Sequence, residues 1–404
     1  MHQANYEKKG GFYSEPMSSK VVRIAPTKDI RPNELVGGPN MSCLISPSPT
    51  DDELKLLQQM GISHCFTWLD DAVSTVEHIG ELRERLNSMG LKLFNVGNRI
   101  RCKSSDIILG SPARSDAIQR FIDWLEVLAK AGIHTTTFTW EPDGVWSTGT
   151  STVRGDTEAR AVDEKMLPTA LGYPGCIKEP PAVPSSSPRA GSTASEPVDA
   201  KTSTDASASA NIAAAGRHGA GEATSWVRKE KYEEEELWAT LQYFLEQVLP
   251  HAARLGVRLA LHPNDPPVPS VAGVPCLIRS REAYERVFAM ANDSPWLGME
   301  FCCGCWLEGG TRFGDLEACM LDYCKRGKVF IVHLRNVTSP LPQFAETFID
   351  EGYGDVHGIC NAMVLGGYKG TVILDHTPEF VPSAGPAAAS AFAIGYIKGT
   401  LRSC

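Results

Sequence analysis

The sequence lacks several features that mark whole classes of protein. No run of about 18 apolar residues, the length that spans a bilayer, occurs in the chain. The first residues, MHQANYEKKGGFYSEP, contain no apolar stretch typical of a signal peptide. Dense basic tracts are also missing, and the formal net charge is −9. We therefore expect a cytoplasmic protein that partners neither membrane nor nucleic acid.

Familiar catalytic and structural motifs are missing too. The chain has no P-loop and no nucleophile elbow, which argues against phosphate cradling by such a loop and against an α/β-hydrolase. Its 12 cysteines lack the two-by-two CxxC spacing of structural zinc sites, and no export signal accompanies them. We therefore expect reduced thiols rather than a disulfide framework or a zinc cluster.

Composition divides the 404 residues into one large domain and two weakly folding segments. Apolar residues make up 42% and charged residues 22%, as in ordinary globular proteins. Residues 179–224 consist mostly of Ala, Ser, Pro, Thr and Gly, and such a segment buries too little surface to offset its ordering entropy. We expect a disordered low-complexity insertion there, a loosely ordered leader over 1–39, and a single domain over 40–404.

Apolar runs of strand length alternate with stretches of helical periodicity, a pattern typical of repeated βα units. The runs are SCLIS at 42–46, ISHCFTWL at 62–69, LKLFNVG at 91–97, IHTTTFTW at 133–140, VRLALHP at 257–263, LGMEFC at 297–302, KVFIVHLRN at 328–336 and GTVILDH at 370–376. The helical stretches between them include DDELKLLQQMG, VEHIGELRERLNSMG, RSDAIQRFIDWLEVLAKAG and EEELWATLQYFLEQVLPHAARLG, which all end in Gly, a usual helix terminator. Eight strands with about as many helices predict an α/β fold, the (β/α)8 TIM barrel. An open doubly wound sheet is the alternative, but no Gly-rich phosphate fingerprint follows the first strand.

The carboxyl ends of barrel strands carry the reactive groups of TIM-barrel proteins. The last four expected strands supply two imidazoles, a thiol and a carboxylate there, from His262, Cys302, His333 and Asp375. Each alone reads best as a core residue, but strand ends converge on one mouth, where the four groups can hold a divalent cation. Imidazole and thiolate suit Zn²⁺ or Fe²⁺, and the carboxylate also suits Mn²⁺. A mouth open to solvent favours catalysis over a structural role.

The motifs around these residues are similar to those of a known family. They are HPNDPP at 262–267, GMEFCCGCW at 298–306, FIVHLRNV at 330–337 and ILDH at 373–376, with IDWLEVLAKAGIHTTTFTWEPDGVW at 122–146 and GVPCLIRS at 273–280. Over most of the chain from about residue 41, they resemble the mannonate dehydratases of the xylose isomerase-like TIM-barrel superfamily. The resemblance implies metal-dependent dehydration of D-mannonate to 2-keto-3-deoxy-D-gluconate. It also implies Mn²⁺ or Fe²⁺, with Zn²⁺ less favoured, bound by His262, Cys302, His333 and Asp375.

That reaction removes the proton α to a carboxylate and expels the neighbouring hydroxyl, so it needs an acid and a base. His376 is the expected proton-transfer residue, because an imidazole titrates near pH ~6.5 and the family has a matching histidine. Arg335 is expected to clamp the substrate carboxylate bidentately, and an ion pair at the barrel rim is the alternative. Both residues lie beside expected metal ligands in the sequence.

Other residues are expected to line the mouth. Asn336 and Trp140 are candidate substrate contacts, with core packing as the alternative for Trp140. Glu346 and Asp355 fall where the family carries acidic residues, and charges on a helix surface explain them equally well. The expected partner is a small-molecule sugar acid, and a homodimer is compatible with the sequence.

Three departures from the family pattern keep other functions open. The family has a tyrosine in the segment after the residue matching Asp375, whereas 388–390 read Ala-Ala-Ser here and Tyr396 falls in the expected closing helix. Asn264 replaces an aspartate, and 302–305 read Cys-Cys-Gly-Cys in place of Cys-Thr-Gly-Ser. A sugar isomerase or epimerase on the same barrel is one alternative function. A sugar-acid-binding homologue with impaired catalysis is the other.

Overall fold

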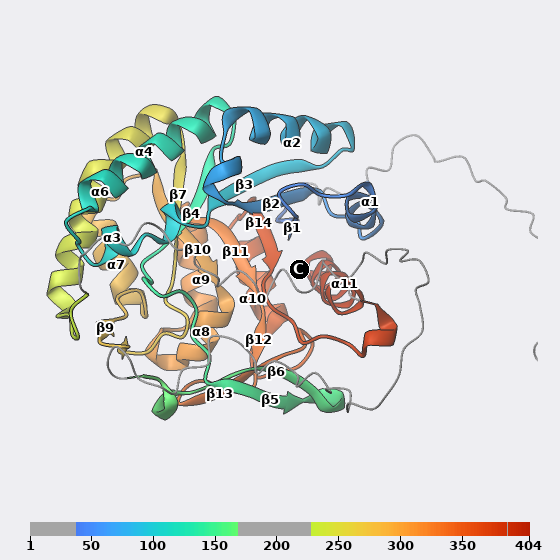
Figure 1. Ribbon diagram of the computed structural model, residues 1–404. Coiled ribbons are helices and arrows are strands. Elements are labelled where there is room, and N and C mark those ends of the chain that lie inside the picture. The colour runs from blue at the N-terminus through green and yellow to red at the C-terminus, as the bar shows by residue number, and fades with distance from the viewer. Residues whose placement is uncertain (1–37, 169–227, 386) are drawn as a thin grey trace, which may run out of the picture. The chain divides into compact units, whose positions relative to one another are not determined.

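The computed structural model describes residues 38–168, 228–385 and 387–404 (Figure 1). The expected insertion at 179–224, and the expected leader apart from its last two residues, lie outside these ranges and stay predictions. Among the described residues, no helix is long and apolar enough to cross a membrane.

The main sheet consists of eight parallel strands, all of which the sequence predicted to within two residues at each end. They are β1 (Asn40–Leu44), β2 (His64–Leu69), β3 (Lys92–Asn98), β4 (Thr135–Thr139), β7 (Arg258–His262), β10 (Leu297–Cys302), β11 (Val329–Leu334) and β14 (Thr371–Leu374). Their spatial order is β3-β2-β1-β14-β11-β10-β7-β4. Strands covered on both faces bury nearly every side chain, which explains their continuous apolar runs.

Side chains bridge the two end strands of this ladder, β3 and β4, which lie next to each other. Thr136 Oγ1 donates to the Val96 carbonyl at 2.8 Å. Asn95 Nδ2 donates to Thr137 Oγ1 at 3.1 Å. The ring of strands is therefore closed, as the TIM-barrel prediction requires, and all eight carboxyl ends share one mouth.

The helices surround the barrel (Figure 1). The four predicted stretches form α1 (Asp51–Gln59), α2 (Val76–Ser88), α4 (Arg114–Lys130) and α6 (Glu234–Leu255). Each is closed by its predicted glycine with φ between 68° and 74°, where a side chain would be strained. The other described helices are α3 (Ser105–Ile108), α7 (Arg281–Met290), α8 (Cys303–Gly309), α9 (Leu316–Lys325), α10 (Val356–Leu365) and α11 (Ala388–Ser403).

A second sheet, which the sequence did not predict, lies at the carboxyl end of the barrel. Its four antiparallel strands are, in spatial order, β12 (Asn336–Val337), β13 (Gln343–Thr347), β6 (Thr157–Asp163) and β5 (Gly149–Val153). A short hairpin of β8 (Ser270–Val271) and β9 (Val274–Pro275) accompanies it. The sheet joins the segment after β4 to the segment after β11, because Val162 pairs with Phe344.

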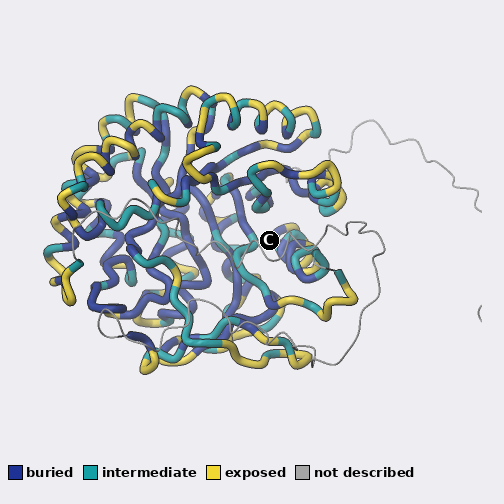
Figure 2. The backbone as a smooth tube through the Cα atoms, viewed as in Figure 1, coloured by how far each residue is buried: buried dark blue, intermediate teal, exposed yellow. Residues whose placement is uncertain are grey.

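Three apolar clusters stabilise this arrangement. A large one fills the layer between the strands and the outer helices, and a small one, including Phe66, Phe330 and Ile373, fills the barrel. A third, including Val162 and Phe344, lies beneath the second sheet. Figure 2 shows the consequence: the strands are buried, and the outward faces of the helices are exposed. The rigid barrel thus fixes the side chains at its mouth.

Candidate metal centre and active site

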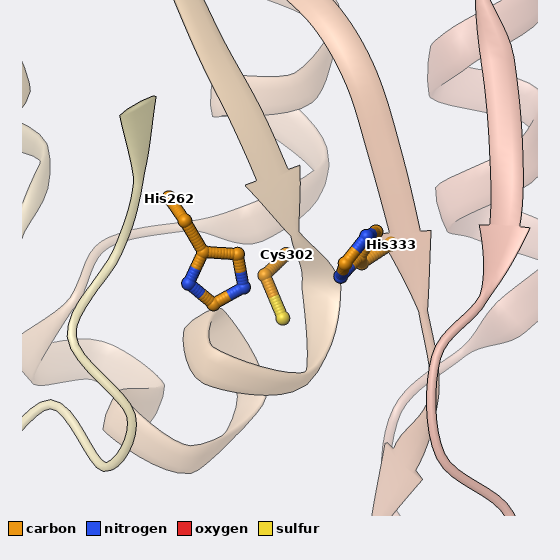
Figure 3. A group of neighbouring side chains, drawn as sticks. All are labelled: His262, Cys302 and His333. Atoms are coloured by element: carbon orange, nitrogen blue, oxygen red, sulfur yellow. The ribbon is translucent and has the colours of Figure 1, made fainter. Parts of the chain in front are cut away.

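Three of the expected metal ligands come together at the barrel mouth. His262 ends β7, Cys302 ends β10, and His333 is the last residue but one of β11. One donor atom from each lies within 4.8 Å of the other two. Figure 3 shows the Cys302 side chain lying between the two imidazole rings. We call these three residues the histidine–cysteine group.

Hydrogen bonding fixes which nitrogen of His262 can bind a cation. Its Nδ1 lies 2.7 Å from the Pro263 carbonyl oxygen, which can only accept a hydrogen bond. The ring proton is therefore on Nδ1, and Nε2 keeps its lone pair. Glu141, on the loop after β4, lies 3.8 Å from the same Nδ1 and adds a negative charge behind the ring. Metal-binding histidines are commonly oriented in this way.

His333 is held by a carboxylate that the sequence analysis missed. Its Nε2 lies 2.6 Å from Oε1 of Glu300, a buried residue on β10 two positions before Cys302. Neither ring nitrogen of His333 makes a well-oriented hydrogen bond within the described part of the chain. Burial lowers the pKa of His333, but Glu300 and Asp375 outweigh it and raise that pKa to about 10. Two carboxylates thus place negative charge around His333, and a bound cation can balance that charge in place of the ring proton.

Asp375, the fourth expected ligand, directly follows β14 and borders the histidine–cysteine group. Its Oδ1 lies 3.5 Å from Nδ1 of His333, and the Cys302 thiol donates to its Oδ2 at 3.5 Å. The Nε of Arg335 donates to Oδ2 at 2.8 Å and fixes the carboxylate in place. All four predicted ligands therefore lie at one mouth, and the fourth contacts two of the other three.

The donor set fits a divalent cation. An imidazole or thiolate donor lies about 2.0–2.3 Å from such an ion, so donors around one ion are at most about 4.6 Å apart. The observed spacing within 4.8 Å needs only a small adjustment. Burial raises the pKa of Cys302, but its neighbours, including Cys305 and Arg335, hold the pKa well below its ordinary value. That favours the thiolate, which is the form that binds metal.

A second group of buried charged residues lies behind the first. The Arg335 guanidinium donates to Asp265 and to Glu308, both at 2.8 Å. Arg160, on β6, donates to Glu346 at 2.9 Å and to Glu308 at 3.2 Å, and also to Asp265. The Arg335 side chain has no exposed area. We call these five residues the arginine–carboxylate cluster.

Arg335 forms ion pairs, as the alternative expectation for it states, but they are buried. Three carboxylates, from Asp265, Glu308 and Asp375, occupy its guanidinium, so no face of it is left for a substrate carboxylate. The pairs lie in the interior and not at an exposed rim. Buried pairs of this kind hold their partners in fixed positions.

The proton-transfer candidate His376 connects the two groups. Its Nδ1 donates to Glu346 Oε1 at 2.8 Å, and its Nε2 lies 3.4 Å from Asp375 Oδ1. Burial lowers the pKa of His376, but the charges of Asp375 and Glu346 raise it to about 9. Its side chain is 30% exposed, so the imidazole is accessible from the mouth.

The two expected acidic residues have different surroundings. Glu346 is a buried strand residue that binds His376 and Arg160, so the helix-surface explanation is wrong for it. Asp355 caps α10 by accepting from the backbone of His357 and Gly358. Asp355 is thus a helix cap.

The two expected substrate contacts have structural partners. Asn336 donates through Nδ2 to the Gly354 carbonyl and accepts at Oδ1 from the backbone amides of Val337 and Gly354. Trp140 is buried and packs against Phe244 with a 5.6 Å ring separation. These contacts fix both residues in the scaffold, and their contact with substrate stays a prediction.

The segment that would carry the family tyrosine begins the last helix. Ala388, Ala389 and Ser390 form the first turn of α11, and Tyr396 lies further along the same helix with 39% exposure. The buried carboxylates nearest the imidazoles are Glu300 and Glu346. A signal for Glu300 was present in the sequence, since a charged residue two positions before Cys302 shares its face of the strand.

Comparisons with known proteins identify the family to which the sequence is similar. A family model described as D-mannonate dehydratase matches residues 53–403. Mannonate dehydratase of Streptococcus pneumoniae (strain 70585) is 34% identical over 151 residues, which cover 37% of this chain and 40% of that protein. Its counterpart in Streptococcus agalactiae serotype Ia is 28% identical over 310 residues, covering 74% of this chain and 77% of that protein. The chain thus matches about 40% of the length of the first of these relatives.

Solved structures share the fold. The crystal structure of mannonate dehydratase from Streptococcus suis serotype2 superposes with a TM-score of 0.66 at 22% identity, covering 91% of this chain and 93% of that one. A structure of L-ribulose 3-epimerase superposes with a TM-score of 0.51 at 11% identity, covering 90% and 94%. At these identities the likeness concerns the barrel itself.

Proposed function

The chain belongs to the D-mannonate dehydratase family, and from that premise we propose that it is a metal-dependent hydro-lyase that converts D-mannonate to 2-keto-3-deoxy-D-gluconate. The observation that supports this most is the convergence of the histidine–cysteine group at the barrel mouth. Family membership supports the reaction class, and the donor set at the mouth supports the dependence on a metal.

The residues that would hold the cation are His262, Cys302, His333 and Asp375. We propose Mn²⁺ or Fe²⁺, because a set with both thiolate and carboxylate suits either ion. A divalent ion bound there supplies a Lewis acid for the charge that develops on the substrate carboxylate.

The chain's own residues divide the remaining tasks. His376 holds or moves a proton at Nε2, because Nδ1 is occupied by Glu346. Its side chain is 30% exposed, more than those of the two proposed histidine ligands. Arg335 acts through Asp375, which it keeps in position with a 2.8 Å hydrogen bond. Glu300 acts on His333 through the 2.6 Å contact between its Oε1 and Nε2 of the ring. We therefore treat Arg335 and Glu300 as positioning residues and His376 as the proton-transfer residue.

An assay on the full chain tests the proposal. We expect the Mn²⁺-loaded protein to convert mannonate to 2-keto-3-deoxygluconate, and the chelated protein to form none. Exchange at C2 in a panel of aldoses and ketoses, without loss of water, would instead identify an isomerase or epimerase. Tight sugar-acid binding without either reaction would identify a binding protein.

A further inference from the structure

Two cysteine sulfurs are in contact at the proposed metal site. The Cys305 thiol donates to Cys302 Sγ with a sulfur–sulfur distance of 3.4 Å. Cys302 is the last residue of β10, and Cys305 lies three positions on in α8. Both side chains are fully buried, and both cysteines are free. Disulfide formation requires the two sulfurs to approach to about 2.05 Å.

Other groups hold the Cys305 thiol near Cys302. It lies 3.7 Å from Nη2 of Arg335. Its sulfur also lies within 4.8 Å of a carboxylate oxygen of Asp265 and of one of Glu308. Those oxygens are already neutralised by guanidinium groups, as described above. Cys305 is therefore not needed as a ligand in the arginine–carboxylate cluster, and its polar contact toward the metal site is with Cys302.

We propose that Cys302 and Cys305 form a reversible disulfide that switches off the metal site. With peroxide as oxidant, the Cys302 thiolate attacks one peroxide oxygen, the O–O bond breaks, and a sulfenic acid and hydroxide form. The Cys305 sulfur then attacks the Cys302 sulfur and gives up its thiol proton as a second hydroxide departs. The two thiol protons convert both hydroxides to water. Two thiols are thereby oxidised to one disulfide, and one peroxide is reduced to two waters.

The consequence for function rests on the proposed metal-dependent activity. A disulfide sulfur carries no thiolate charge, so oxidation removes one of the four proposed ligands. A bound cation engages the same sulfur and protects it, so the metal-free chain is the oxidisable form. A site that admits a sugar acid also admits the smaller peroxide. Reduction by a dithiol restores the ligand.

The wild-type protein gives the first test. We expect metal-free, full-length chain treated with one equivalent of hydrogen peroxide to lose a single pair of its 12 thiols. Differential alkylation and peptide mass spectrometry should assign that pair to Cys302 and Cys305. The treated chain should take up no Mn²⁺ until dithiothreitol is added, and Mn²⁺ added before peroxide should prevent the loss. Free thiols at both positions after treatment, or pairing elsewhere, would overturn the inference.

Two serine variants provide a matched comparison. Cys305→Ser should bind Mn²⁺ when reduced but form no disulfide, so dithiothreitol should restore nothing after peroxide. Cys303→Ser, at the buried neighbour between the pair, should behave like the wild type. Dithiol-reversible loss of metal uptake in Cys305→Ser would contradict the pairing. Failure of the reduced wild type to bind Mn²⁺ would count against the proposed function alone, because thiol mapping still tests the pair.

Discussion

Two groups of buried ionisable side chains lie at the mouth of the barrel, and they differ in what balances their charge. In the arginine–carboxylate cluster, two guanidinium groups supply hydrogen bonds to every carboxylate. In the histidine–cysteine group, both nitrogens of His333 lack well-oriented hydrogen bonds within the described residues. Both groups contain ligand atoms at metal-binding spacing. Spacing alone therefore does not identify a metal site; among the described residues, the two groups differ in that guanidinium groups already bond to the carboxylates of the arginine–carboxylate cluster.

The largest effect is expected from a substitution in the histidine–cysteine group. We expect His333→Ala to abolish metal retention while the barrel stays folded, because it removes one donor from a site at the rim of a rigid scaffold. Elemental analysis of the purified variant and circular dichroism measure the two outcomes. His357→Ala, at an exposed histidine on α10, is the control. Normal metal content in His333→Ala would remove this residue from the site.

The next largest effect is expected from a substitution in the arginine–carboxylate cluster. Arg335→Gln should lower the free energy of unfolding by about 3–5 kcal/mol, because it leaves buried carboxylates without their partner. Denaturant unfolding with and without Mn²⁺ measures the change. A loss below about 1 kcal/mol, the range of exposed pairs, would show that these carboxylates are not held by Arg335.

A smaller effect is expected at Glu300, which contacts a proposed metal ligand but is not itself one. Glu300→Gln keeps the shape of the side chain but removes the charge that faces His333. We expect metal affinity to fall about 10–100-fold, the usual cost of losing an orienting partner. Titration with Mn²⁺ measures it, and Glu282→Gln, at an exposed position on α7, is the control. Equal affinities for both variants would make Glu300 an ordinary buried acid.

The smallest effect sets the baseline for arginine pairs. Arg154 donates to Asp350 at 2.8 and 2.9 Å, but its side chain is 45% exposed. Arg154→Gln should change the free energy of unfolding by at most about 1 kcal/mol, since solvent screens such a pair. The same denaturant unfolding experiment checks this. A loss matching that of Arg335→Gln would remove burial as the explanation of the difference.

The barrel could be predicted from the sequence because its signals are local. Each of the eight strands lies in a short run rich in β-branched or apolar residues, and the four predicted helices end at glycines. The second sheet gave no such signal. β5 reads Gly-Thr-Ser-Thr-Val and is largely exposed, and β12 has two residues. Pairing of β6 with β13 joins segments about 180 positions apart, which no periodicity reveals.

The site residues also divide into those that local signals predict and those that they do not. His262, Cys302, His333 and Asp375 could be selected because strand ends share a mouth, a rule that needs only the position of each strand. Arg160 could not, because it reaches the cluster from the unpredicted second sheet. The partners of Arg335 could not be predicted either, because Asp265 and Glu308 come from loops and helices whose placement depends on tertiary packing.

One carboxylate oxygen links the second sheet to the proposed proton-transfer residue. Oε1 of Glu346 accepts from Arg160 at 2.9 Å and from His376 at 2.8 Å. A displacement of β6 should therefore alter the electric field at the imidazole through this shared oxygen. Substitutions in the hairpin after β4 should change the turnover of the proposed reaction more than the substrate affinity, so this hairpin acts as a remote control on the imidazole.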